Sequence, residues 1–261
     1  MKNDRLKSIL GIPYLLFLTI VVVCPVLILL YYAFTNGAGQ FSMDNFVLFF
    51  TDSKAIGTLI YSAMIAIVTT VVCLLIAYPV AYILAKGDFK RGNVLLMLFV
   101  MPMWINFTLR ITALKEILTM IEGNLAFHPF LNTVIGMTYD FLPFMILPIY
   151  NTTAKIDHSY IEAALDLGAK HHRVFTRVIL PLSIPGIISG ITMVFLPAMT
   201  NYVVLDMMYN STYIMGSLVG SYFNMYDWNN GSVISMILLI LILFLSMLTG
   251  EFSDKEENAY D

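Results

Sequence analysis

Long apolar runs dominate this sequence and decide the solvent in which it folds. A bilayer core about 30 Å thick is crossed by about 20 apolar residues in a helix, because lipid offers no hydrogen-bond partners to unpaired backbone groups. Six runs reach about that length, at residues 12–34, 58–84, 94–111, 131–150, 179–202 and 232–249. We therefore expect an all-α integral membrane protein with about six transmembrane helices.

Composition excludes the common soluble classes. Of the 261 residues, 59% are hydrophobic and 12% charged, where a soluble domain carries about 25% charged residues. The net charge of −3 provides no field that would hold a polyanion, which disfavours nucleic-acid binding. Cys24 and Cys73 both lie in apolar runs, so no disulfide framework is implied. The first run lacks a small-residue cleavage site and is expected to be a retained helix.

Orientation follows from the distribution of lysine and arginine, because positive charge is retained on the cytoplasmic side. With the N-terminus inside, 3 of the 14 basic residues face outward, namely Lys54, Arg110 and Lys115. The remaining 11 face the cytoplasm: Lys2, Arg5, Lys7, Lys86, Lys90, Arg91, Lys155, Lys170, Arg173, Arg177 and Lys255. Both termini are therefore predicted to be cytoplasmic.

One connection, residues 151–178, is long, polar and predicted to be cytoplasmic. Ile156, Tyr160, Ala163/Ala164 and Leu167 recur at helical spacing, which predicts an amphipathic helix with these residues on one face. Ser159 and Glu162 have the spacing of a capping box, and Gly168 would end the helix. Such a helix could lie on anionic lipid, with Lys170, Arg173 and Arg177 facing head groups. Alternatively, its apolar face could enter a groove on a cytoplasmic partner.

A motif in this connection favours docking. Glu162-Ala163-Ala164, Gly168 and Val178-Ile179-Leu180-Pro181 resemble the EAA loop of ABC-transporter importer permeases, with Val178 in the place of the usual isoleucine. The resemblance implies the type I ABC importer permease fold. It further implies that Glu162, Ala163, Ala164, Gly168, Leu180 and Pro181 couple the chain to an ATPase.

Shorter strings extend the resemblance over most of the chain. They are Pro102-Met103-Trp104-Ile105-Asn106, Leu109-Arg110-Ile111, Leu142-Pro143-Phe144-Met145, Leu196-Pro197-Ala198-Met199 and Asp227-Trp228. In this order they are similar to the spermidine/putrescine permease subunits of the PotB type. The resemblance implies polyamine import, with another small solute as the alternative.

The partners follow from the same resemblance. The sequence contains no G-x-x-x-x-G-K-[ST] loop for nucleotide phosphates, so no cofactor is expected in this chain and ATP would be bound by a partner subunit. The implied partners are a cytoplasmic ABC ATPase dimer, a second homologous permease subunit, an extracytoplasmic polyamine-binding protein and membrane lipid. The expected location is a bacterial cell membrane, inner or plasma. We expect a cytoplasmic segment 1–11, a six-span domain 12–250 and an acidic cytoplasmic tail 251–261.

Candidates for a cation pathway are few. Asp140 lies near the centre of a predicted span, where a carboxylate costs at least about 2.5 kcal/mol unless it faces protein or water, so it is either a pathway or a structural residue. The resemblance places a carboxylate on the substrate route at Asp206, near Tyr202. Trp104 and Asn106 could add an aromatic wall and a polar contact, although a tryptophan at this depth is also a membrane anchor. Arg110 would repel a cation and is expected to be a counter-ion or interfacial group.

Two other classes remain open. A secondary transporter would need an inverted repeat or broken helices in matching halves, and no clear repeat is seen. A membrane enzyme lacks support, because His128, His158, His171 and His172 do not form a ligand set and neither H-E-x-x-H nor G-x-S-x-G occurs. Docking predicts that Gly168→Asp abolishes uptake while the protein still inserts.

Overall fold

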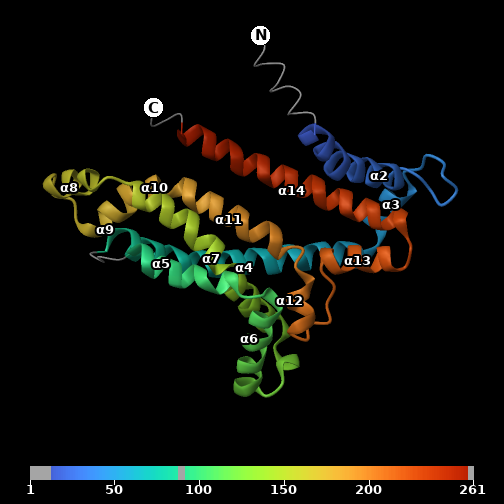
Figure 1. Ribbon diagram of the computed structural model, residues 1–261, viewed down its shortest axis with the longest axis horizontal. Helices are drawn as coiled ribbons and strands as arrows, with labels where there is room; N and C mark the ends of the chain where they lie inside the picture. The colour runs from blue at the N-terminus through green and yellow to red at the C-terminus, as the bar shows by residue number, and fades with distance from the viewer. Residues whose placement is uncertain (1–12, 88–91, 258–261) are drawn as a thin grey trace, which may run out of the picture. The chain divides into compact units, whose positions relative to one another are not determined.

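The computed structural model describes residues 13–87 and 92–257, which are mostly helical (Figure 1). The predicted segment 1–11, the end of the predicted tail and five of the basic residues counted above lie outside the described residues. In chain order the helices are η1 (Thr19–Val23), α2 (Cys24–Ala33), α3 (Asp44–Thr51), α4 (Ser53–Lys86), α5 (Gly92–Val100), η2 (Met101–Trp104), α6 (Phe107–Glu122), η3 (Leu125–Phe127), α7 (Pro129–Lys155), α8 (His158–Asp166), α9 (His171–Val174), η4 (Phe175–Ile179), α10 (Leu180–Leu182), α11 (Ile184–Ala198), α12 (Tyr202–Met207), α13 (Met215–Asn224) and α14 (Trp228–Glu257).

The chain forms two compact units. The first contains the residues up to Thr58 together with Ser217–Leu241, and the second contains Leu59–Gly216 together with the residues from Ile242 onward. The first unit thus holds α2, α3, the start of α4, most of α13 and the first part of α14. The second holds most of α4 and all helices from α5 to α12.

Three described helices are long and apolar enough to cross a bilayer: Pro13–Ala33, α4 and α7. They coincide with the predicted runs 12–34, 58–84 and 131–150. The predicted run 232–249 lies in α14, whose apolar part Trp228–Phe244 is shorter. Up to 5 spans are present among the described residues if each of two bent helix pairs counts as one. The all-α membrane fold is confirmed.

The predicted run 94–111 is not one continuous helix. A bend of 97° separates Val94–Trp104 from Phe107–Glu122. Ile105 is extended, with ψ 143°, and the Asn106 side chain accepts hydrogen bonds from the backbone N–H groups of Thr108 and Leu109. Because an asparagine at this position starts a new helix, the apolar pattern alone predicted the wrong geometry here.

The predicted run 179–202 is also interrupted. A bend of 61° at Ser183 separates His171–Leu182 from Ile184–Ala198. Pro185 follows the bend at the start of α11, where its missing N–H costs little. The run therefore joins the end of the polar connection to α11, and α11 ends at Ala198.

The core of the second unit lies between α7 and α11, which run side by side in Figure 1. Met137, Met145, Ile146 and Ile149 of α7 are fully buried. Close approach is possible because Gly186 of α11 has no side chain: a Cβ there would stand 2.7 Å from the backbone oxygen of Pro148. This is a small-residue helix contact of the kind common in membrane proteins.

Candidate functional site

The polar connection 151–178 folds into α8, α9 and the π-helical segment η4. Helix α8 begins at His158, and its cap is Asp157, whose Oδ1 accepts a hydrogen bond from the Ser159 N–H at 2.9 Å. The capping box predicted at Ser159 is therefore wrong, because the aspartate two residues earlier takes the cap position. Hydrogen bonds from Ser159 hold the pKa of the Asp157 carboxyl below its usual range.

Gly168 terminates helix α8, as predicted, and follows the cap residue Leu167. Gly168 has φ +78°, its N–H donates to the Leu165 carbonyl at 2.8 Å, and the Ala169 N–H donates to the Ala164 carbonyl at 3.0 Å. This pair of bonds is a Schellman motif, which needs a left-handed residue after the helix. No described atom lies within 4 Å of a Cβ placed on Gly168. Within this chain, glycine is thus required by the backbone conformation and not by lack of room.

The periodicity predicted one apolar face made by Ile156, Tyr160, Ala163/Ala164 and Leu167. The structure divides this set, because Tyr160, Ala163 and Leu167 are exposed whereas Ile156 and Ala164 are packed inward. Ile161, Ala164 and Leu165 pack against a buried cluster formed by Ile156, Val174 and Ile179. By contrast, Tyr160 is 58% exposed and Leu167 is 89% exposed. Ile161, Ala164 and Leu165 thus pack on the chain itself, whereas the Tyr160 and Leu167 side chains are available for contact with another molecule.

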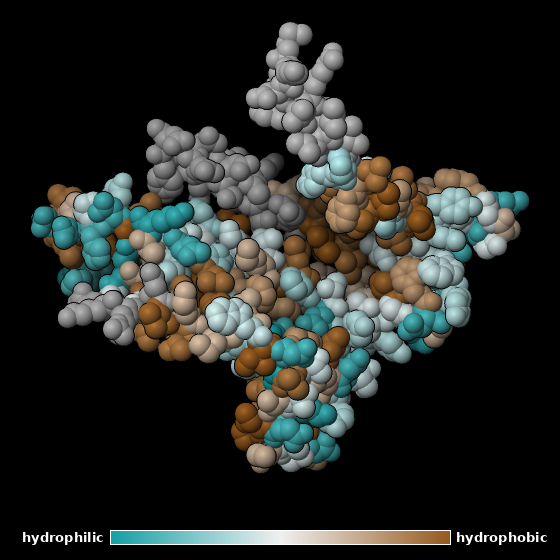
Figure 2. All heavy atoms as spheres, viewed as in Figure 1, coloured by the Kyte–Doolittle hydropathy of each residue, from teal (hydrophilic) through white to brown (hydrophobic). Residues whose placement is uncertain are grey.

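The exposed end of α8 borders a shallow groove of about 280 Å³. Its lining includes Leu167, Gly168, Arg173 and Arg177. Glu162 and Ala163 are exposed on the same helix, whereas Leu180 and Pro181 are half-buried at the start of the next. Figure 2 shows hydrophilic residues gathered over α8. An exposed leucine beside a basic groove is more typical of a surface that docks on another protein than of a purely polar loop.

The connection is fastened to α4. Phe175 of η4 stacks edge-on against Tyr78 and Tyr82, with ring centroids 5.8 Å and 5.5 Å apart. The Tyr78 hydroxyl lies 3.0 Å from the Ser183 hydroxyl, and Lys86 donates a hydrogen bond to the Ile156 carbonyl. The connection that contains α8 is therefore held to α4 by ring packing and by hydrogen bonds.

Asp140 and Arg110 form a buried ion pair between α6 and α7. The distance from Arg110 Nη2 to Asp140 Oδ1 is 2.5 Å, and the two side chains are 7% and 6% exposed. The Arg110 Nε and Nη1 atoms are buried without a hydrogen-bond partner among the described residues. This pairing fits the structural one of the two roles that the sequence left open for Asp140.

The other pathway candidates lie at the surface. Trp104 is 78% exposed, and the Asn106 side chain is used to cap α6. Tyr202 and Asp206 stand four residues apart on α12, both exposed, so they share one face of this short helix. Spacing thus brings the last two together, whereas no hydrogen bond or ion pair between described residues joins Trp104 or Asp140 to them.

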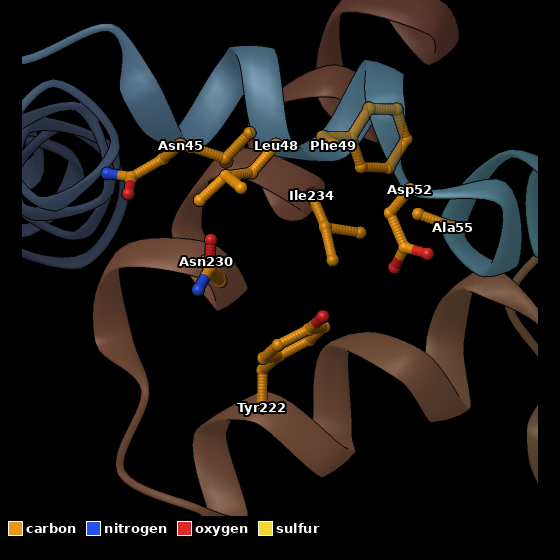
Figure 3. A pocket seen from close by; sticks show the side chains of 9 residues that line it. Asn45, Leu48, Phe49, Asp52, Ala55, Tyr222, Asn230 and Ile234 are labelled. Atoms are coloured by element: carbon orange, nitrogen blue, oxygen red, sulfur yellow. The ribbon is translucent and has the colours of Figure 1, made fainter.

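Two polar sites were missed from the sequence. In the second unit, the buried Asn210 donates to the Tyr61 and Thr133 hydroxyls, each at 3.0 Å. In the first unit, Asp52 and Tyr222 line a cavity (Figure 3). Asp52 adjoins an aromatic run at a helix end, which was the available signal. Among the described residues no group of three metal-ligating side chains is present.

Comparison with known families matches residues 77–252 to the "binding-protein-dependent transport system inner membrane component" family. The chain belongs to this permease family. The resemblance drawn from the EAA residues is thereby confirmed, and the permease is a membrane subunit of a transport system. By the family's description, such systems depend on a binding protein.

Relatives of the permease carry a more specific name. The spermidine/putrescine transport system permease protein PotB of Escherichia coli K12 is 34% identical over 218 residues, covering 77% of this chain and 79% of the relative. The protein of the same name from Haemophilus influenzae is 39% identical over 194 residues, covering 68% of each.

Solved structures support the permease fold. A chain of a bacterial alginate ABC transporter, in complex with its alginate pentasaccharide-bound periplasmic protein, has a TM-score of 0.75 at 13% identity, covering 97% of this chain and 96% of that one. A chain of the MetNI methionine ABC transporter in an inward-facing conformation has a TM-score of 0.60 at 15% identity, covering 78% and 99%.

Proposed function

We propose that this permease forms half of the translocation pathway of an ATP-driven importer for polyamines, spermidine or putrescine. The observation that carries the substrate class is the 34–39% identity to relatives named as spermidine/putrescine permeases. The fold does not select a substrate, since neighbours of the same fold are named for alginate and for methionine. Another small solute is therefore the alternative.

Energy would come from a partner. In this proposal a cytoplasmic ABC ATPase dimer binds ATP and docks on α8, contacting Glu162, Ala163 and Leu167. The exposure of Tyr160 and Leu167 and the basic groove beside Gly168 support this contact. Closure of the ATPase pair would push α8, and the contacts of Lys86 and Phe175 would pass this movement to α4.

The remaining partners and the orientation are part of the same proposal. A second homologous permease would complete the pathway, and an extracytoplasmic binding protein would deliver the polyamine. Both termini would be cytoplasmic in a bacterial inner or plasma membrane. Tyr202 and Asp206 would offer an aromatic face and a carboxylate to the cation, an attraction worth about 0.5 to 2 kcal/mol for the aromatic part.

The test is co-expression with the neighbouring chromosomal genes, followed by pull-down and ATPase measurement in nanodiscs. We expect an ATPase to co-purify and its activity to rise with spermidine-loaded binding protein. Co-purification without a polyamine response would discard the substrate and keep the permease. Failure to recover any ATPase would overturn the docking role of α8.

A matched pair of variants sharpens the docking test. Leu167→Asp places a charge at a side chain that is 89% exposed on α8, and Met225→Asp does the same at one that is 75% exposed between α13 and α14. We expect the first to lose the ATPase and the second to keep it. Equal retention by both would exclude Leu167 from the contact.

A further inference from the structure

The first unit contains a cavity that the proposed coupling does not use. It has a volume of about 250 Å³ and lies between α3, the start of α4, α13 and α14 (Figure 3). Asp52, Tyr222 and Asn230 supply its polar groups, and Leu48, Phe49 and Ile234 supply apolar walls. No lysine or arginine lines it.

The acidic end of the cavity is built by Asp52 and Tyr222. Figure 3 shows the Asp52 carboxylate and the Tyr222 hydroxyl directed toward one another, yet no hydrogen bond between them occurs among the described residues. One carboxylate oxygen, Oδ1, accepts the Lys54 N–H at 2.9 Å. Burial and the negative charges of Asp52 and Asp227 raise the pKa of the Tyr222 phenol. The space between the two groups is thus at negative potential.

The opposite end offers a neutral acceptor. Asn230 donates its amide Nδ2 to Asp227 Oδ2 at 2.8 Å, and its N–H lies 3.1 Å from Asp227 Oδ1. This bond uses one of the two N–H donors of the amide, and the amide oxygen, which Figure 3 shows turned toward α3, adds an acceptor to the lining. Acceptors at both ends with apolar walls between them suit a ligand with donor groups on a hydrocarbon chain.

We propose that this cavity binds one aminoalkyl end of the transported cation, with its primary ammonium between Asp52 and Tyr222 and its methylene groups against Leu48, Phe49 and Ile234. This subsite rests on the proposed function for the identity of the cation. The volume is below the range of about 300–1,000 Å³ that holds a whole drug-sized ligand, which fits one end of a longer amine.

Anions and uncharged lipid tails fit the cavity less well. An anion would meet a carboxylate and two acceptor-bearing groups without any cationic side chain on the lining. A hydrocarbon tail would cover the cavity-facing oxygens of Asp52 and Asn230 without offering them a donor, which is unfavourable. An ammonium offers Asp52 a counter-charge and a donor, which neither an anion nor a hydrocarbon tail provides.

The experiment compares uptake and ATPase activity of the complete transporter in proteoliposomes, using labelled spermidine and putrescine. Asp52→Asn keeps the acceptor for the Lys54 N–H but removes the charge, and Asp44→Asn removes a charge from an exposed position at the start of α3. We expect about a tenfold loss of uptake in the first, because charged hydrogen bonds are worth about twice neutral ones. We expect the second to stay within about twofold of wild type, since surface charges contribute little.

Measuring ATPase activity distinguishes a loss of cation binding from a loss of folded transporter. Stimulation by the loaded binding protein is expected to survive in Asp52→Asn, and Asp52→Glu is expected to restore uptake. Equal uptake by Asp52→Asn and Asp44→Asn would overturn the subsite. Parallel loss of uptake and ATPase stimulation in Asp52→Asn would show a structural role for Asp52 and would also overturn it.

A direct binding measurement keeps this test independent of the proposed function. Thermal unfolding of the purified complex is followed with 1,4-diaminobutane and with 1,4-butanediol, which has the same chain without charge. We expect the diamine alone to raise Tm, in Asp44→Asn but not in Asp52→Asn. Equal Tm shifts with the two probes would reject the subsite. If the diamine alone raises Tm but the wild-type transporter takes up no polyamine, only the proposed polyamine transport would be rejected.

Discussion

The ammonium of Lys86, the last residue of α4, donates a hydrogen bond to the backbone carbonyl of Ile156, which directly precedes the cap of α8. Ile156 is itself 8% exposed and belongs to the cluster on which α8 packs. The end of a long apolar helix and the start of the proposed docking helix are therefore joined by a polar bond and by packing. A force applied to α8 has a short route into α4.

Replacing Lys86 with methionine keeps the stem of the side chain and removes the donor. We expect uptake per ATP hydrolysed to fall, because a hydrogen bond from a charged group contributes about 1.5 to 3 kcal/mol and its loss frees α8 from α4. The control is Lys155→Met, since Lys155 is exposed one residue before Ile156. Uptake and ATPase rates are measured together in proteoliposomes, and an unchanged ratio in Lys86→Met would remove this bond from the coupling route.

Substitutions at Gly168 test whether its left-handed backbone conformation is what uptake requires. At φ +78° a residue with a Cβ pays about 1 to 2 kcal/mol, whereas asparagine tolerates this region better than alanine. We therefore expect Gly168→Asn to retain more uptake than Gly168→Ala, and Gly168→Asp to be the worst because it adds charge at the docking surface. Co-purified ATPase is measured alongside uptake. Equal loss in the asparagine and alanine variants would assign Gly168 to close fit against a partner.

The sequence predicted the helices where apolar length alone decides them. The runs 58–84 and 131–150 became α4 and α7, with bounds shifted by a few residues. The bend at Asn106 was not predicted, because a hydropathy pattern does not register a side chain that competes for backbone N–H groups. The interruption at Ser183 has a different origin, because Pro185 supplies no N–H to the preceding turn and the Ser183 hydroxyl donates to the Leu180 carbonyl.

The connection 151–178 could be recognised from its motif, but the sequence did not show which of its side chains are exposed. Periodicity could not distinguish Ala164, which packs inward, from Leu167, which is exposed, because both are apolar. Nor could it choose Asp157 over Ser159 as the cap. The cavity at Asp52 was not predicted, since Tyr222 lies 170 positions away in the chain and only tertiary structure brings the two together.

Asp157 makes the start of α8 sensitive to acid. Its pKa is held below the ordinary value by hydrogen bonds from Ser159, so its contribution to folding is present above the unfolded pKa near 4 and is lost as pH falls through the lower folded value. We expect α8 to open at acid pH, and Asp157→Asn, which keeps an acceptor, to weaken this dependence. Hydrogen exchange of residues 158–167, corrected for intrinsic rates, measures it. Identical pH profiles in both proteins would contradict this role.

Gly186 tests the contact between α7 and α11. A Cβ at Gly186 would stand 2.7 Å from the Pro148 carbonyl oxygen, a backbone atom that cannot move away alone. We expect Gly186→Ala to lower Tm in detergent, with a cost of about 1 to 3 kcal/mol as for other overpacked cores. Gly57→Ala is the control, because no described atom lies within 4 Å of its Cβ position. Equal Tm values for the two variants would mean that the helices separate without penalty.

Variants of the Arg110–Asp140 pair distinguish a structural role of Asp140 from a role in transport. Removing one partner leaves a buried uncompensated charge, so Asp140→Asn and Arg110→Leu are each expected to destabilise by about 3 to 5 kcal/mol. The double variant Arg110→Leu with Asp140→Leu removes both charges together and should recover most of the lost Tm. Uptake by that double variant then decides the role of Asp140: recovery together with stability assigns it to holding α6 against α7, whereas stable protein without uptake would place its carboxylate on the cation's route.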